Sequence, residues 1–454
     1  MNDNICALAT PAGGAIGMIR VSGPDAIGIT NKIFSRDLTV AKPNTIHYGE
    51  MVDAAGNTID DVLVSVFRAP HSYTGEDSTE ISCHGSAYIL KTAVQALIDA
   101  GCRMAEPGEY TKRAYLNGKL DLSQAEAVAD LIATTNRASH RLALSQLKGH
   151  FSSELSVLRK QLLEITSLLE LELDFSDHEE LEFANREELQ QLVQKIHEHI
   201  STLAHSFETG NALKKGIPVA IIGKTNVGKS TLLNRLLHED KAIVSEIHGT
   251  TRDVIEDTTE INGIVFRFID TAGIRHIDDK VEQLGIERTF QKLNEATIVI
   301  WLMDQIPSED EQIEIRKRIG NKKLIRVLNK IDLAQSTENT AELSLDTDGA
   351  PFLSISAKHN IHIDRLENTL YQTANIPEIN ENSVIVTNIR HYEALTRADE
   401  SISRVIDAMK MNLSSDLISE ELRISLDQLA DITGGQITPN EVLKNIFKHF
   451  CIGK

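Results

Sequence analysis

Residues 218–230 read PVAIIGKTNVGKS, and this stretch decides the fold of the middle of the chain. PVAII is a short apolar run that predicts a buried strand, and GKTNVGKS at 223–230 matches the pattern GxxxxGK[ST]. A helical sequence, TLLNRLL, follows directly. A strand that enters a helix through such a loop surrounds phosphate groups with backbone N–H groups. We therefore predict a nucleoside triphosphate site here.

Apolar runs beyond this loop predict an α/β domain. The runs VFRFIDT, TIVIWLMD, LIRVLNK and FLSIS alternate with helical segments between residues 214 and 378. Near-continuous apolar strands are typical of a parallel sheet that is covered on both faces. We therefore expect residues 214–378 to form an α/β P-loop domain with a mostly parallel sheet.

The flanking sequence predicts two further domains. Residues 1–117 alternate strand-like runs with one helical stretch, which favours an α+β domain. Residues 118–213 become helical, and apolar residues recur at helical spacing at Leu155, Leu158, Leu162, Ile165 and Leu169. Residues 379–454 are helical again, so we expect one discontinuous α-helical domain that closes from both sides of the inserted domain.

The charge of the chain limits its partners. It has 46 Lys and Arg residues against 66 Asp and Glu residues, a formal net charge of −20. This argues against a broad, sequence-independent grip on nucleic acid, so an RNA substrate needs a local basic patch or a more basic partner. The acidic stretch at 169–183 indicates a solvated face or loop, with metal binding by its carboxylates as the alternative.

Cysteine usage and hydropathy indicate the compartment. Cys6, Cys83, Cys102 and Cys451 form no CxxC pair, so neither a zinc site nor a redox motif is predicted. No apolar run approaches the roughly 20 residues of a membrane span, and the start of the chain carries no secretory signal. We expect a cytoplasmic protein with no membrane partner.

Three later motifs, each after a predicted strand, indicate guanine rather than adenine. Asp270-Thr271-Ala272-Gly273 reaches Mg²⁺ through Asp270 and the terminal phosphate through the Gly273 N–H. In Asn329-Lys330-Ile331-Asp332, the Asp332 carboxylate accepts hydrogen bonds from the N1–H and the amino group of guanine, a donor pair that adenine lacks. Ser356-Ala357-Lys358 fits a loop that closes over the base.

The residues that orient water for hydrolysis are unusual. Small signalling GTPases place a Gln directly after the glycine that corresponds to Gly273, but this chain has Ile274 there. Glu282 is the candidate replacement, although its spacing alone favours an exposed helix carboxylate. Arg252 and Arg275 are candidate arginine fingers, and an oxygen of Asn226 is suited to a monovalent cation that neutralises developing charge beside the phosphates.

The chain resembles the MnmE (TrmE) family of tRNA modification GTPases along its whole length. The resemblance rests on GKTNVGKS, GTTRD at 249–253, DTAGIR, NKID and the terminal CIGK, and on N-terminal motifs. The N-terminal motifs are GMIRVSG at 17–23, SYTGED at 72–77, CHG at 83–85, PGEYT at 107–111 and LNGKLDL at 116–122. The G motifs are generic to GTPases, and the CIGK end and the N-terminal motifs make the match specific.

The resemblance implies a folate site in residues 1–117, which also form the dimerisation domain. The ligand is a tetrahydrofolate one-carbon derivative, the 5-formyl or the methylene form. Its expected contacts are Arg20, Glu80, Lys119 and Lys454. Cations suit the anionic folate tail, and a carboxylate suits the pterin edge. Cys451 is either a catalytic group near the folate carbon or a buried thiol.

The resemblance also implies the metal and nucleotide contacts. Ser230 and Thr251 would ligate Mg²⁺, and Asn226, Ser245, Ile247 and Thr250 would hold K⁺. Glu282 takes the catalytic position. The expected GTP contacts are Asn226, Val227, Gly228, Lys229, Ser230, Thr231, Ser245, Glu246, Ile247, His248, Gly249, Thr250, Thr251, Asp270, Thr271, Ala272, Gly273, Asn329, Lys330, Asp332, Ser356, Ala357 and Lys358.

The implied partners are a second copy of the chain, tRNA and the flavoprotein MnmG in a heterotetramer. Together they would add an aminomethyl-type group to carbon 5 of the wobble uridine, with K⁺-activated GTP hydrolysis that depends on G-domain dimerisation. The alternative is a ribosome-assembly GTPase, an RNA-binding switch. Such proteins usually append a basic domain, and the charge of −20 argues against that alternative.

Overall fold

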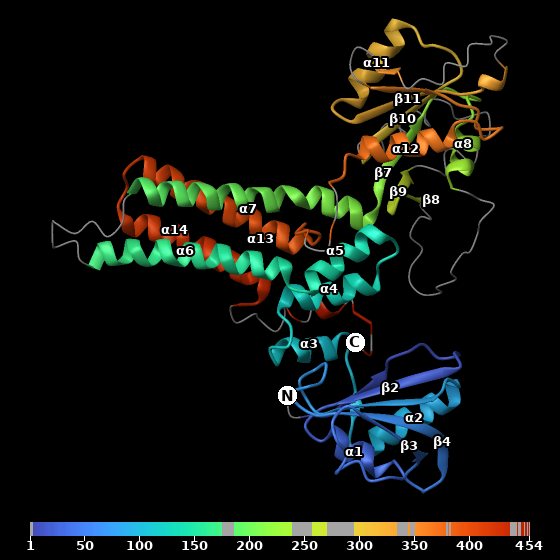
Figure 1. Cartoon of the computed structure of the whole chain (residues 1–454), viewed down its shortest axis with the longest axis vertical. Coiled ribbons are helices and arrows are strands. Elements are labelled where there is room, and N and C mark those ends of the chain that lie inside the picture. Colours follow the sequence, from blue (N-terminus) through green and yellow to red (C-terminus); the bar gives the residue numbers. More distant parts are fainter. Residues whose placement is uncertain are drawn as a thin grey trace. The chain divides into compact units, whose positions relative to one another are not determined.

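The computed structural model describes most of the chain (Figure 1). The described residues are 3–174, 186–237, 257–269, 295–333, 344–345, 350–377, 380, 383–435, 443, 446–448, 450, 451 and 453.

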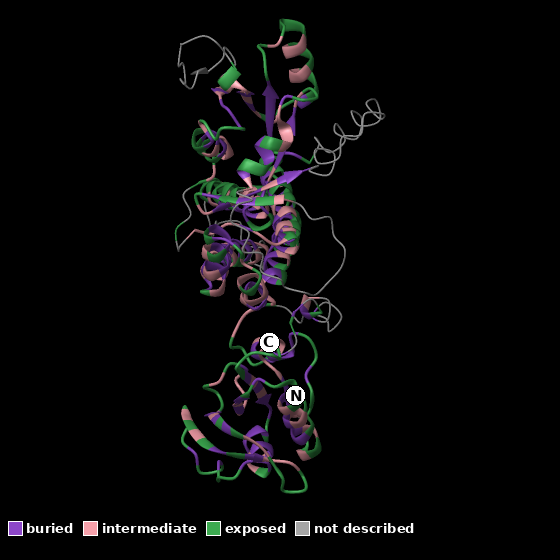
Figure 2. Cartoon of the chain, turned by 90° about the vertical axis from the view of Figure 1, so that its right-hand side faces the viewer, coloured by how far each residue is buried: buried purple, intermediate pink, exposed green. Residues whose placement is uncertain are grey.

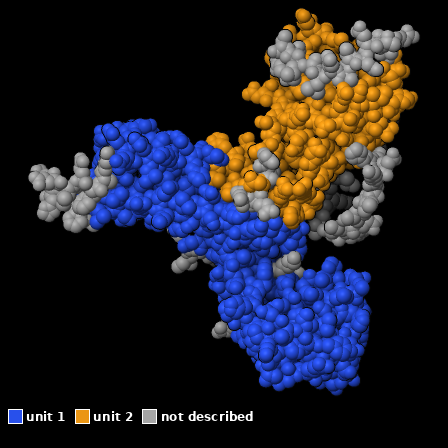
Figure 3. All heavy atoms as spheres, in the orientation of Figure 1, with its two compact units in different colours: residues 1–133, 143–202, 390–454 blue, residues 134–142, 203–389 orange. Residues whose placement is uncertain are grey.

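The chain divides into two compact units, which Figure 3 distinguishes by colour. Unit 1 contains residues 1–133, 143–202 and 390–454, and unit 2 contains residues 134–142 and 203–389. Unit 2 is therefore inserted in sequence within unit 1. The predicted multidomain fold, with a P-loop domain inserted into a discontinuous helical domain, is confirmed.

Unit 1 begins with a six-stranded sheet of order β3-β4-β5-β2-β1-β6, in which only β1 and β6 pair in parallel. Helices α1 and α2 accompany it, so the α+β prediction for this region is confirmed. The elements are β1 (Ile5–Leu8), β2 (Ile16–Ser22), α1 (Ala26–Lys32), β3 (Thr45–Val52), β4 (Thr58–Phe67), β5 (Ser78–His84), α2 (Ala87–Ala100) and β6 (Arg103–Met104).

The two faces of this sheet differ in polarity. Alternate residues such as Ile19, Val64 and Ile81 are buried in a core that also contains Leu90 and Leu97 of α2. Figure 2 shows the same alternation of buried and accessible residues along the strands. Because side chains alternate along a strand, the neighbouring positions of β2 and β5 face away from that core. This second face is where polar residues of the candidate site lie.

The rest of unit 1 is helical, as predicted. The five apolar residues of the helical repeat all lie in α6, and each is at most 1% exposed. Helix α14 packs along α6, and an exposed ion pair of 2.6 Å joins Arg423 to Glu170. The helices are α3 (Glu109–Leu116), α4 (Leu122–Ile132), α6 (His150–Asp174), α13 (Ile389–Lys410) and α14 (Ser415–Thr433), while α5 (Arg137–Leu147) and α7 (Arg186–Lys215) continue from one unit into the other.

Unit 2 contains a seven-stranded sheet of order β12-β13-β11-β10-β7-β9-β8. The central strands are parallel, and antiparallel β8 and β12 pair at the two edges. The predicted mostly parallel sheet is confirmed. Its elements are β7 (Ile217–Ile222), α8 (Lys229–Leu236), β8 (Asp257–Ile261), β9 (Ile264–Ile269), β10 (Ile298–Met303), α11 (Glu309–Ile319), β11 (Lys323–Leu328), η2 (Ile331–Leu333), β12 (Ser344–Leu345), β13 (Pro351–Ser354) and α12 (Ile363–Ala374).

The core of unit 2 explains why its strands are so apolar. All six residues of β10 are buried. Ile300 packs on one face of the sheet with Leu233 of α8 and Leu366 of α12, while Val299 packs on the other face with Ile319 of α11. Both faces of the strand are therefore covered, so both sets of alternating side chains must be apolar. Among the described helices, none has the length and apolar content that a membrane span requires.

A buried ionic cluster joins α4 to the start of α13 in unit 1. The Arg390 guanidinium donates to both Glu126 carboxylate oxygens at 2.9 Å, and Nε2 of His391 lies 2.6 Å from Oε2 of Glu126. Burial disfavours the charged carboxylate, but His391 and Arg390 outweigh it and lower the pKa of Glu126 to about 2. Segments on either side of the insertion are thus joined by one carboxylate.

Glu126→Gln should lower the free energy of unfolding of unit 1 by roughly 3 kcal/mol at pH 7, because it leaves a buried cation without its counter-ion. The folded pKa of Glu126 lies below its ordinary value of 4.5. Its stabilisation is therefore complete above that value and is lost as the pH falls through about 2. Urea denaturation followed by circular dichroism at pH 7 and pH 3 should show a smaller difference between variant and wild type at pH 3.

The single tryptophan, Trp301, lies in β10 of unit 2, and its fluorescence provides the internal control. Its transition should be the same in both proteins. An equal difference in the free energy of unfolding between variant and wild type at both pH values would contradict the role of the Glu126 charge.

Candidate functional site

The predicted phosphate loop leads from β7 into α8. Gly223, Asn226 and Gly228 have positive φ values of 154°, 62° and 102°. A Cβ atom on Gly223 would lie 2.1 Å from the Leu302 carbonyl oxygen, and one on Gly228 would lie 2.4 Å from Nδ2 of Asn329. Both positions therefore require glycine for space as well as for conformation. The close approach of Leu302 in β10 and of Asn329 after β11 thus restricts the conformation of the loop.

Lys229 lies at the first position of α8 and points its amine back at the loop. Its Nζ donates to the carbonyl oxygens of Gly223 at 2.7 Å and Lys224 at 2.8 Å. Burial lowers the pKa of the Lys229 ammonium, because desolvation disfavours its charge. A cation at the start of a helix, beside the backbone N–H groups of the first turn, is the arrangement that binds terminal phosphates. Ser230 and Thr231 follow it in the first turn.

Asn329 connects the phosphate loop to the predicted base loop. Its Nδ2 donates to the Val227 carbonyl oxygen at 2.8 Å, and its Oδ1 accepts from the Ala357 N–H at 2.9 Å. The side chain is 5% exposed and uses both ends of its amide. An Asp or a Leu could not supply both a donor and an acceptor. The structure thus brings the phosphate loop, the Asn329–Asp332 motif and the Ser356–Lys358 loop to one edge of the sheet.

Asp332 is oriented by the loop that follows β13. Ser356 Oγ donates to its Oδ1 at 2.6 Å, and Nε2 of His359 lies 3.5 Å from its Oδ2. The hydrogen bond from Ser356 is the main cause that lowers the pKa of Asp332. A carboxylate held in its ionised form accepts hydrogen bonds only, which suits a base edge with two donors.

Arg235 is a member of this site that sequence reasoning did not predict. From α8 it donates to the carbonyl oxygens of Ala357 and Lys358, both at 3.2 Å. It therefore holds the base loop from the side of the phosphate-loop helix. Its position on one exposed face of an amphipathic helix gave no signal in the sequence. Lys330, which was predicted, pairs with Asp304 at 3.1 Å.

Several predicted residues lie outside the described part of the chain, and the structure places none of them. These are Ser245, Glu246, Ile247, His248, Gly249, Thr250, Thr251, Arg252, Asp270, Thr271, Ala272, Gly273, Arg275, Glu282 and Lys454.

A second polar site lies on the open face of the sheet in unit 1. Arg20 of β2 and Glu80 of β5 are register partners, and both Nε and Nη2 of Arg20 donate to Oε1 of Glu80, at 2.9 and 2.7 Å. The Arg20 guanidinium also lies over the rings of Tyr73 at 5.5 Å and Tyr110 at 5.6 Å. Two predicted folate contacts are thus adjacent, and they form a half-buried pair.

The C-terminal segment approaches the same site. The Gly453 carbonyl oxygen accepts from Nη1 of Arg20 at 3.3 Å, and the Gly108 N–H donates to the Cys451 carbonyl oxygen at 3.3 Å. The Cys451 thiol is exposed, so the expectation of a buried thiol is wrong. Buried Phe447 and Phe450 occupy the apolar contacts in this segment, which leaves Cys451 at the surface.

Lys119 is held beside this site by a different segment. Its Nζ donates to the Pro70 carbonyl oxygen at 3.0 Å, in the loop that also carries Tyr73. The structure therefore connects Lys119 to Arg20 through that loop. Within the described residues, no group of three or more His, Cys, Asp or Glu side chains forms a metal site. Much of the acidic stretch at 169–183 lies outside those residues.

Comparison with known proteins matches almost the whole chain to one family. Residues 4–119 match the family model described as GTP-binding protein TrmE N-terminus, and residues 122–451 match the MnmE helical domain. A Bacteroides fragilis protein with the name tRNA modification GTPase MnmE is 56% identical over 100% of this chain and 99% of its own length. Proteins of the same name from Phocaeicola vulgatus and Flavobacterium johnsoniae are 54% and 50% identical, over 100% of this chain and 99% of their own length.

Asp332→Asn should shift nucleotide preference from GTP towards xanthosine triphosphate by about a hundredfold or more, because the new amide pairs with the extra carbonyl of xanthine. Competition of both nucleotides against a fluorescent analogue measures the shift. Asp364→Asn, an exposed change in the first turn of α12, is the matched control and should leave the preference unaltered. Identical selectivity in Asp332→Asn and wild type would exclude base reading by Asp332.

Proposed function

This chain belongs to the MnmE family of tRNA modification GTPases, and from that premise we propose that unit 2 binds GTP with Mg²⁺ while unit 1 supplies one-carbon chemistry for the tRNA. The chain is a GTP hydrolase that acts in tRNA modification. The observation that carries the proposal is the Asn329 side chain, which bonds the phosphate loop at Val227 and the base loop at Ala357. The phosphate loop and the base loop, joined at one edge of the sheet, can then bind the two ends of the nucleotide.

Each part of the nucleotide has a proposed contact in unit 2. Lys229 and the backbone N–H groups of residues 226–231 bind the phosphates, and Asp332 with the Ser356–Lys358 loop binds guanine. Ser230 and Thr251 would hold Mg²⁺, which neutralises phosphate charge when bound. Asp270 and Gly273 contact the terminal phosphate region, and Glu282 orients the attacking water. These assignments rest on the motifs and, for the described residues, on their shared sheet edge.

A monovalent cation is proposed beside the phosphates. K⁺ would be held by Asn226, Ser245, Ile247 and Thr250, and it would take the place of an arginine finger. The support is the position of Asn226, an exposed side chain at a loop residue with φ of 62°. Dimerisation of the G domains across the nucleotide would complete the active arrangement.

A reduced folate is the proposed ligand of unit 1. Arg20, Glu80, Lys119 and Lys454 would bind a 5-formyl- or methylene-tetrahydrofolate, whose tail is anionic and whose pterin edge suits a carboxylate. The support is the half-buried Arg20–Glu80 pair on an open sheet face, with Gly453 in contact. Cys451, exposed in the same segment, is the proposed reactive group.

The remaining proposals concern organisation. We place an N-terminal folate and dimerisation domain at 1–117, the two helical parts at 118–213 and 379–454, and the G domain at 214–378. A homodimer joined through the N-terminal domains would bind the flavoprotein MnmG as a heterotetramer in the cytoplasm. The product would carry an aminomethyl or carboxymethylaminomethyl group on carbon 5 of the wobble uridine.

Mass spectrometry of wobble uridines in a deletion strain tests this function. The intact gene should restore the modified base, and Lys229→Ala should not, because the phosphates lose their cation. Lys224→Ala is the matched control: this lysine lies in the same loop but is 63% exposed and pairs with Glu311. It should restore the modification. Full rescue by Lys229→Ala would overturn the link between GTP and tRNA modification.

Replacing K⁺ by Na⁺ should slow GTP hydrolysis by about tenfold or more. The reason is that K⁺, the larger ion, fits the proposed oxygen ligands and neutralises the developing charge, whereas Na⁺ does not fit them. Asn226→Ala should hydrolyse GTP at the same slow rate in both salts. Phosphate release at saturating GTP is the measurement. Equal wild-type rates in K⁺ and Na⁺ would rule out the cation.

A further inference from the structure

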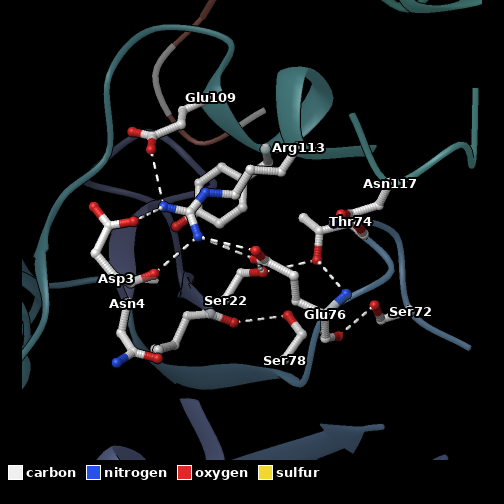
Figure 4. A network of polar contacts seen from close by, with 12 residues as sticks. Asp3, Asn4, Ser22, Ser72, Thr74, Glu76, Ser78, Glu109, Arg113 and Asn117 are labelled. Carbon is white, nitrogen blue, oxygen red and sulfur yellow. Dashed lines mark hydrogen bonds and ion pairs between the residues drawn. The ribbon is translucent and has the colours of Figure 1, made fainter. Parts of the chain in front are cut away.

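A buried arginine, Arg113 of α3, joins its own helix to two other segments of unit 1, which carry Asp3 and Glu76 (Figure 4). Its side chain is 1% exposed. It pairs with Asp3 at 2.9 Å, Glu76 at 3.1 Å and Glu109 at 3.0 Å. None of these four residues has a part in the proposed GTP or folate chemistry.

Stability alone is a weak reason for such a cluster. Desolvation of buried charges offsets most of their attraction, and well-packed apolar replacements are often equally stable. A guanidinium differs from an apolar side chain in that its planar fork fixes the directions of several partners at once. The segments that Arg113 connects therefore indicate what the cluster does.

Glu76 belongs to the loop at residues 70–77, so its ion pair with Arg113 fixes one point of this loop. Ser22 Oγ donates to Oε2 of Glu76 at 2.8 Å, and Ser72 Oγ donates to the Glu76 carbonyl oxygen at 2.6 Å. The same loop is held at a second point, where Nδ2 of Asn117 donates to the Thr74 carbonyl oxygen at 2.7 Å. Figure 4 shows these contacts converging on Glu76 and Thr74 from β2 and from the end of α3.

The loop in turn contacts two residues of the proposed folate site. It carries Tyr73, whose ring lies 5.5 Å from the Arg20 guanidinium, and its Pro70 carbonyl oxygen accepts from Lys119 Nζ at 3.0 Å. A displacement of this loop would therefore move the surroundings of both cations together.

We propose that Arg113 is a positioning residue of the one-carbon site: through Glu76 it fixes residues 70–77, and these set the positions of Arg20 and Lys119. This inference rests on the proposed folate function. A polyanionic ligand with a planar ring needs its cations at fixed separation, and small misplacements of binding groups are costly.

The test compares Arg113→Met with Arg103→Met. Arg103 contacts the same Asp3 and Glu109 carboxylates, at 2.6 and 2.8 Å, but among the described residues no hydrogen bond or ion pair joins it to Glu76. Calorimetric titration with 5-formyl-tetrahydrofolate should show binding weakened about tenfold or more in Arg113→Met, and by less than about twofold in Arg103→Met. Equal affinities in the two variants would overturn the proposal.

A second readout needs no folate. The rate at which an N-hydroxysuccinimide ester acylates Lys119, followed by peptide mass spectrometry, should rise in Arg113→Met and stay at the wild-type rate in Arg103→Met. An unchanged rate in both variants would overturn the positioning role. If the wild type fails to bind the folate, the folate function falls, while the acylation result still decides whether Arg113 fixes the loop.

Asn117→Ala keeps the proposal falsifiable if Arg113→Met does not fold. It removes the contact to Thr74 from an exposed side chain and leaves the buried cluster intact. We expect folate affinity to fall about threefold and acylation of Lys119 to rise, a smaller effect in the same direction. Wild-type values for both measurements would count against control of the site by this loop.

Discussion

The amide of Asn329 is the interaction on which the nucleotide site depends. Its two hydrogen bonds, to Val227 and Ala357, join loops that are far apart in the sequence. Without a group that both donates and accepts, the buried loop carbonyl and the buried loop N–H would each lose a partner, at a cost comparable to a whole hydrogen bond. Arg235 extends this connection to the carbonyl oxygens of Ala357 and Lys358, and Ser356 extends it to Asp332, the residue proposed to bind the base.

The same logic applies in unit 1, where polar groups fix segments that apolar packing leaves free. The sheet and its helices share an apolar core, but the open face carries Arg20 and Glu80, which packing does not orient. Two tyrosine rings and the Gly453 carbonyl oxygen surround the Arg20 guanidinium. Glu126 plays the equivalent part among the helices, because it binds Arg390 and His391 from across the insertion. In each case a buried or half-buried charge specifies a position that hydrophobic contact alone would allow to vary.

The family assignment relates the proposed GTP site and the proposed folate site to one activity. The chain is a GTP hydrolase that acts in tRNA modification. Its proposed GTP site lies in unit 2 and its proposed folate site lies in unit 1. Helices α5 and α7 each continue from one unit into the other, so the chain passes between unit 1 and the GTPase region within helices. Within unit 1, Tyr115 of α3 donates to the Gly434 carbonyl oxygen at the end of α14.

The sequence by itself determined the strands of the parallel sheet, the long helix α6 and the phosphate loop. These depend on local periodicity and on a motif whose glycines are needed wherever a loop wraps phosphate. The antiparallel edge strand β8, which reads DTTEI, escaped prediction because edge strands need no continuous apolar run. Only the tertiary structure decided that Arg235 contacts the base loop, that Arg113 reaches Glu76 and that Cys451 is exposed. Those outcomes depend on which surfaces meet, and no spacing along the chain encodes the partner of a polar side chain.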